Sequence, residues 1–173
     1  AGVPDLRPDL PTIGESLALH GAEALAQRRL DPLRRAADVF GFHLATLDLR
    51  QNSEVNEAAV AELFARARVS ADYAALAEDA RVALLVRELG NPRPLHSPHL
   101  DYSDRVDREL AVLRTAAGIH RRFGADALSN YVVSKCQSVS DLLEVALLLQ
   151  EAGLADGESL VVDIVPLFET IDD

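Results

Sequence analysis

The sequence predicts an α/β fold in which helix predominates and about three parallel strands form one sheet. Stretches with two-residue alternation or a run of β-branched residues occur over residues 42–50, 131–134 and 160–165. Longer stretches with helical periodicity and capping residues separate them. Since neighbouring parallel strands need a long crossover connection, this order of elements favours parallel pairing.

Two helices are expected before the first strand. Over residues 11–30, leucines recur between alanines after a capping-box pair that begins at Thr12, and Gly21 is a weak point. Asp31 followed by a proline is typical of an N-cap and a first helical turn, which predicts a second helix over 32–40.

The first strand is expected to have one polar face. Within residues 42–50, Thr46, Asp48 and Arg50 share a face under two-residue alternation, while alanine and leucine occupy the other face. Ser53 then caps an amphipathic helix.

Two further helices and a loop lead to the second strand. A helix is expected over 77–89, where a glycine closes it, and three prolines predict a loop over 91–103. Ser103 begins a long amphipathic helix that ends at Gly124.

The last part contains the second strand over 131–134, a helix from about Ser140 to Gly153, and a third strand over 160–165 that Pro166 ends. Three such strands would leave two open edges and an uncovered face. We therefore expect part of a larger barrel or open sheet, and the pattern alone does not distinguish the two.

The composition excludes several classes of function. The 173 residues include 17 Lys+Arg, 28 Asp+Glu and one cysteine, for a formal charge of −11. This acidity disfavours nucleic acid or an anionic membrane as the main partner, and no stretch reaches the roughly 18 apolar residues of a membrane span. The lone cysteine fits a reducing compartment, so we expect a soluble, cytoplasmic protein with no nucleic-acid and no membrane partner.

Polar residues follow all three predicted strands, at the ends where ligands bind in α/β barrels and in open sheets. Arg50 can hold a phosphate or carboxylate bidentately, and an ion pair with Asp48 or another carboxylate is the equal alternative. Glu169, near two aspartates, can ligate a hard cation such as magnesium, although on pattern alone an ordinary acidic chain end is favoured.

The remaining candidates favour structural roles. Pro98 lies between His96 and His99, which argues against a helical two-histidine metal site, so we expect solvated loop residues. We expect His43 to be a hydrogen-bonded core residue, because it lies on the apolar face of the first strand. We expect Cys136 to be a structural thiol, because it has no neighbouring histidine.

Several long segments resemble one known family in order and separation. They are FGFHLATLDLRQNSEVNE (40–57), RELGNPRPL (87–95), NYVVSKCQSVSDLLEVALLLQEAGL (130–154) and DIVPLFETIDD (163–173). Together they closely resemble phosphoenolpyruvate carboxylase of the bacterial type. The resemblance covers essentially the whole chain and is far more specific than the spacing arguments above.

The resemblance implies a fold, an assembly and a reaction. It implies a cytosolic homotetramer of much longer chains around a largely helical TIM-type (β/α) barrel, so that residues 1–173 would be an internal fragment of this barrel. It also implies that magnesium or manganese supports the joining of bicarbonate to phosphoenolpyruvate, which gives oxaloacetate and phosphate for the tricarboxylic acid cycle. The metal would neutralise an enolate and arginines would hold the phosphate.

By position, the resemblance also implies two site residues. Glu169, in FETIDD, resembles the metal-ligating carboxylate of the family. Arg50, in LDLRQ, resembles an arginine of the substrate phosphate pocket and is our candidate for a catalytic and substrate-binding residue. Asn56 stands where the family usually has histidine, and we assign it no role.

Three family segments do not occur in this sequence: T-G-H-P-T with its catalytic histidine, Y-S-D-S-x-K-D with the second metal carboxylate, and the F-H-G-R-G-G loop. We therefore expect the further metal ligands to lie outside this chain, and we expect these 173 residues alone neither to bind the metal tightly nor to turn over. The alternative is a non-catalytic interaction module derived from the same barrel.

Overall fold

The computed structural model describes residues 6–41, 45–155 and 159–169, which fall into two units, residues 1–46 and residues 47–173. The expected α/β fold with a parallel three-stranded sheet is confirmed, and the sheet lies in the second unit. Among the described residues, no helix combines the length and the apolar character that crossing a membrane requires.

The first unit is helical. Its elements are α2 (Asp9–Leu19), α3 (Glu23–Leu25), the π-helix η1 (Ala26–Leu30) and α4 (Asp31–Phe40). The helix expected over 11–30 is interrupted at its weak point, where Gly21 adopts φ +69°, a conformation that favours glycine. It also begins before Thr12, so the predicted capping box is wrong: the Thr12 hydroxyl donates to the Pro8 carbonyl within the helix.

The predicted N-cap at Asp31 is also wrong, because α4 continues from η1 without a break and Leu30 keeps helical angles. Pro32 has no N–H, and its ring crowds the carbonyl four residues earlier. The regular helical ladder is therefore disturbed in the turn before this proline, where the π-helix lies. Leu30 packs with Leu10 and Ala37 in the small core of this unit.

The sheet of the second unit has the order β1-β2-β3, with both pairs parallel. Its strands are β1 (Leu47–Asn52), β2 (Leu128–Ser134) and β3 (Asp163–Leu167). β1 therefore starts later than predicted, and residues 42–44 of the predicted strand lie outside the described part. Pro166 does not end the third strand but pairs with Val133, since β3 is an edge strand of the described sheet and an edge tolerates a missing N–H.

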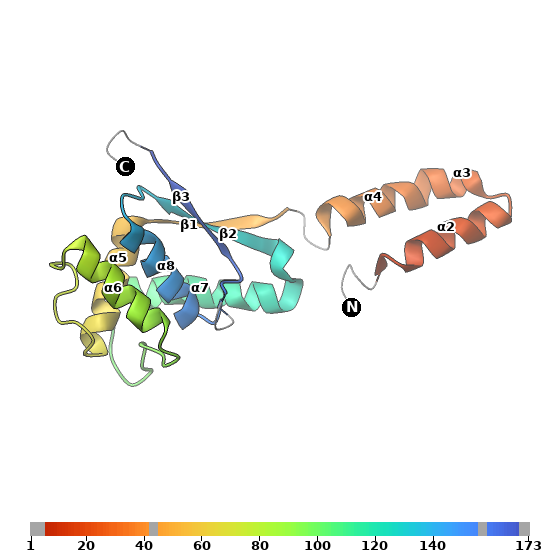
Figure 1. Cartoon of the computed structure of the whole chain (residues 1–173). Helices are drawn as coiled ribbons and strands as arrows, with labels where there is room; N and C mark the ends of the chain where they lie inside the picture. The colour runs from red at the N-terminus through yellow and green to blue at the C-terminus, as the bar shows by residue number, and fades with distance from the viewer. Residues whose placement is uncertain (1–5, 42–44, 156–158, 170–173) are drawn as a thin grey trace. The chain divides into compact units, whose positions relative to one another are not determined.

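Four long helices gather on one side of this sheet (Figure 1). They are α5 (Ser53–Arg66), α6 (Glu78–Leu89), α7 (Asp104–Phe123) and α8 (Val139–Glu151), and a short 3-10 turn, η2 (Ala125–Ala127), precedes β2. Ser103 caps α7 as predicted, through a hydrogen bond from the Val106 amide. The other two caps lie earlier than predicted: Asn52 caps α5, and Ser138 caps α8 with Asp141 in a capping box.

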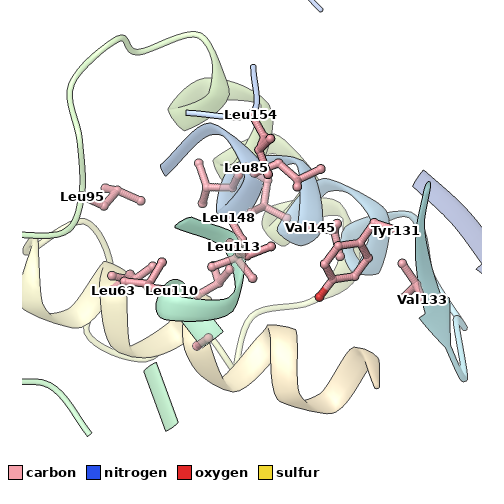
Figure 2. Close-up of a cluster of buried hydrophobic side chains, with 14 of the residues drawn as sticks. Leu63, Leu85, Leu95, Leu110, Leu113, Tyr131, Val133, Val145, Leu148 and Leu154 are labelled. Carbon is pink, nitrogen blue, oxygen red and sulfur yellow. The ribbon is translucent and has the colours of Figure 1, made fainter. Parts of the chain in front are cut away.

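The core lies between the sheet and these helices. Tyr131 and Val133 of β2 point into a cluster of buried leucines and valines from the loop after α6 and from all four helices or their ends, as Figure 2 shows for Leu63, Leu85, Leu95, Leu110, Leu113, Val145, Leu148 and Leu154. Burial of such side chains contributes roughly 1.5–3 kcal/mol each. This packing fixes the face of the sheet that carries Tyr131, and so the opposite face is left for polar residues.

Candidate functional site

The three strands end at the same edge of the sheet. Asn52, Ser134 and Leu167 lie opposite one another in register, each as the last residue of its strand. Because side chains alternate along a strand, the residues two positions earlier, including Arg50, share their face. This face is the one that the helices leave open, and Arg50 and Val165 on it are exposed.

The structure brings together the two predicted site residues, which are 119 positions apart. Arg50 donates from Nη2 to Oε1 of Glu169 at 2.7 Å. The side chains are 61% and 31% exposed, so the pair lies at the surface of the described chain. The ion pair that we considered as an alternative for Arg50 is thus present, but with Glu169. Asp48 instead accepts a hydrogen bond from the Asn130 side chain at 2.8 Å.

Ser134 ends the second strand and is polar, as the sequence indicated, but sequence reasoning assigned it no role in the site. Its Oγ accepts a hydrogen bond from Nε of Arg50 at 2.8 Å, and the residue is only 8% exposed. A serine at the end of a strand is common, so its type carries little information. Its position as the last residue of the central strand was the available signal.

Backbone and side-chain contacts hold the two strand ends together. The Ser53 hydroxyl donates to the carbonyl of Lys135 at 2.8 Å, and so the start of α5 is tied to the residue after β2. Lys135 has φ +53°, which is uncommon for a residue with a side chain. Because β1 runs directly into α5, this contact fixes the strand on which Arg50 lies.

A second polar layer lies beneath this edge. Gln51 donates to Glu109 of α7 at 2.9 Å, and the Tyr131 hydroxyl donates to Oδ1 of Asn56 at 2.8 Å. Burial raises the pKa of the Tyr131 phenol above its usual range, and the charge of Glu109 raises it further. Asn56 is fully buried, and its Nδ2 has no hydrogen-bond partner within residues 6–41, 45–155 and 159–169.

A buried carboxyl lies deeper in the same unit. Glu144 of α8 is fully buried, its Oε1 accepts a hydrogen bond from the Tyr73 hydroxyl at 2.8 Å, and its Oε2 has no partner in the described chain. Burial raises the pKa of Glu144 to about 8, although the hydrogen bond from Tyr73 acts in the opposite direction. Arg81, which lies over the Tyr73 ring, pairs with Glu57 of α5.

Comparison with known proteins identifies the family. A family model described as phosphoenolpyruvate carboxylase matches residues 2–173. The chain belongs to the phosphoenolpyruvate carboxylase family. A phosphoenolpyruvate carboxylase of Aromatoleum aromaticum is 58% identical over 175 residues, which cover 100% of this chain and 19% of that protein. Phosphoenolpyruvate carboxylases of Burkholderia mallei and Azorhizobium caulinodans are 53% and 52% identical, covering 95% and 96% of this chain and 17% and 18% of those proteins.

This member of the phosphoenolpyruvate carboxylase family thus spans less than a fifth of the length of the relatives described above. The matched residues 2–173 include Arg50 and Glu169, which form the ion pair of the site.

The described residues of the site offer one carboxylate to a metal ion rather than a complete set of ligands. Glu169 offers carboxylate oxygen, the donor that magnesium prefers in proteins. Across the described residues, however, no group of three or more histidine, cysteine, aspartate or glutamate side chains is placed to hold a metal ion. Among the described residues, Glu169 can therefore offer one carboxylate ligand, and these residues do not supply a complete coordination shell.

The other candidates from the sequence lie away from this edge or are buried. Cys136 is buried, as expected for a structural thiol, and His43 lies outside the described residues. His99 is exposed as expected. His96 is not simply solvated: its ring stacks on Tyr102 with centroids 4.7 Å apart.

Proposed function

We propose that this chain is a segment of a phosphoenolpyruvate carboxylase and that it supplies two groups of the active site, Arg50 and Glu169. The reaction is the magnesium- or manganese-dependent carboxylation of phosphoenolpyruvate with bicarbonate to oxaloacetate and phosphate. The observation that carries the proposal is the contact between Arg50 and Glu169 at the carboxyl edge of a parallel sheet. This edge is where α/β enzymes place their ligands.

Arg50 is the residue that binds the anionic substrate. A guanidinium is always charged and presents paired N–H donors that match the oxygens of a phosphate or a carboxylate. Arg50 lies on the open face of the sheet, where a substrate can reach it. As negative charge moves between substrate oxygens during the reaction, a fixed cation at this place stabilises it without reorganisation.

Glu169 is the residue that contributes to the metal site. When bound, the divalent cation supplies a Lewis acid that neutralises negative charge on substrate oxygen. Glu169 would hold the cation through its carboxylate, which lies beside the Arg50 guanidinium. The remaining ligands come from parts of the longer protein.

The architecture and assembly belong to the same proposal. The three parallel strands are covered by helices on one face and carry Arg50 and Ser134 on the other, and they fit one arc of a TIM-type barrel whose interior this second face lines. Residues 1–173 are then an internal fragment of that barrel, in a cytoplasmic homotetramer of full-length chains.

The test compares the full-length protein with the isolated chain. Oxaloacetate formation is measured through a coupled malate dehydrogenase assay, with phosphoenolpyruvate, bicarbonate and Mg²⁺ supplied. We expect the full-length protein to turn over and residues 1–173 alone to give only background. Activity of the isolated chain would contradict its proposed dependence on the remaining segments. An inactive full-length protein would instead favour the interaction module.

A further inference from the structure

The Arg50 guanidinium has one edge occupied and another available. Nε donates to Ser134 and Nη2 to Glu169, and these two nitrogens form one edge of the planar group. Within residues 6–41, 45–155 and 159–169, the side chain of Arg50 makes its hydrogen bonds through Nε and Nη2, and Nη1 makes none. Nη1 and the second hydrogen of Nη2 together form the other edge of the guanidinium. This edge can donate two hydrogen bonds to one oxyanion.

Ser134 is a rigid support for this contact. It lies in β2, the central strand, which is paired on both sides, opposite Asn52 and Leu167. The backbone just beyond it is held as well, because Lys135 accepts the hydrogen bond from Ser53 and the Cys136 amide donates to the Leu167 carbonyl. Its hydroxyl therefore has a fixed place, whereas the Arg50 side chain is long and 61% exposed.

We propose that Ser134 is a positioning residue that orients the Arg50 guanidinium for the phosphate or carboxylate group of phosphoenolpyruvate. This inference rests on the function proposed above. An exposed arginine samples many rotamers, and fixing it on binding costs conformational entropy. The Ser134 hydroxyl holds Nε before the substrate arrives, and so the available edge of the guanidinium already points in one direction.

The geometry also separates the roles of the two partners of Arg50. Glu169 is charged and serves the cation, so a change there alters charge as well as orientation. Ser134 is neutral, and its Oγ accepts one hydrogen bond from Arg50. Removal of this hydroxyl therefore changes the orientation of the guanidinium while the net charge of the site stays the same.

The test uses the full-length protein and a pair of side chains with the same shape. S134T keeps a hydroxyl at this position and S134V does not, and both residues suit a strand. Steady-state kinetics give KM and kcat for phosphoenolpyruvate, and calorimetry gives its dissociation constant. S140A is the matched control, because Ser140 is also a buried serine but its hydroxyl contacts Glu78 rather than Arg50.

We expect S134V to raise KM and the dissociation constant for phosphoenolpyruvate about tenfold, because a hydrogen bond to a charged group is lost. We expect S134T and S140A to stay within about twofold of the wild-type protein, and kcat and the KM for bicarbonate to change little in S134V.

Equal affinities of S134T and S134V, or a rise as large in S140A, would overturn the positioning role. If the full-length wild-type protein neither binds nor converts phosphoenolpyruvate, the proposed function is wrong, and the role of Ser134 is wrong with it. S134A provides a second comparison: it should resemble S134V, and a value equal to that of the unchanged protein also counts against the inference.

Discussion

Nη2 of Arg50, in β1, and Oε1 of Glu169, two residues after β3, form an ion pair at 2.7 Å. The order β1-β2-β3 places β2 between them, so this contact spans the central strand. One cationic and one anionic group at such a distance can serve an anionic substrate and a cation together.

Replacing Arg50 by lysine tests bidentate binding. R50K keeps the charge but loses the planar fork, so we expect kcat/KM of the full-length protein for phosphoenolpyruvate to fall about 100-fold. R66K on the exposed end of α5 is the control and should behave as the unchanged protein. A fall below threefold in R50K would mean that charge alone is sufficient at this position.

Replacing Glu169 by glutamine tests the metal role. E169Q removes the negative charge with little change of shape, so we expect the dissociation constant for Mn²⁺, measured by electron paramagnetic resonance on the full-length protein, to rise about tenfold or more. Asp163 is an exposed acid at the opposite end of β3, and D163N should leave the constant unchanged. Equal affinities of E169Q and the unchanged protein would exclude Glu169 as a ligand.

The buried carboxyl of Glu144 makes stability depend on pH. Its pKa of about 8 in the folded protein lies above the ordinary 4.5, so the folded protein holds a proton that the unfolded chain releases. The contribution of Glu144 to the free energy of unfolding is therefore greatest below about pH 4.5, and it decreases as the pH rises toward 8.

E144Q keeps a neutral side chain at every pH. We expect it to be more stable than the unchanged protein at pH 8, on the order of 2 kcal/mol, and similar to it at pH 5. The thermal unfolding midpoint of both full-length proteins, measured from pH 5 to pH 8, gives the difference directly. A difference that does not change with pH would show that Glu144 does not carry this proton.

Two glycines in open space should respond oppositely to alanine. Gly153 follows α8 with φ +76°, and an added Cβ would meet nothing within 4 Å, so G153A should lower stability by about 1 kcal/mol through backbone strain alone. Gly118 lies inside α7 with equally open surroundings, and G118A should raise stability by about 0.5–1 kcal/mol. Unfolding midpoints of the two variants should therefore move in opposite directions, and a shift of the same sign would contradict this explanation.

Much of the second unit could be predicted from local patterns. Periodicity located all three strands and the long helices, and Ser103 was recognised as a cap, because these signals depend on a few neighbouring residues. The first unit was predicted less well. In that unit Pro32 disturbs the helical turn that precedes it, where the π-helix lies. The N-cap rule applied to Asp31 considers only the residues that follow, so it predicted a new helix instead of a continuous one.

For the site, the pattern of residues showed that all three strand ends are polar, and the resemblance to the family singled out Arg50 and Glu169. Their mutual contact was decided by tertiary structure, since parallel pairing of β1, β2 and β3 brings together residues 119 positions apart. Ser134 received a role only in the folded chain. A serine hydroxyl has no characteristic pattern in sequence, and its function arises from the guanidinium that the neighbouring strand places 2.8 Å away.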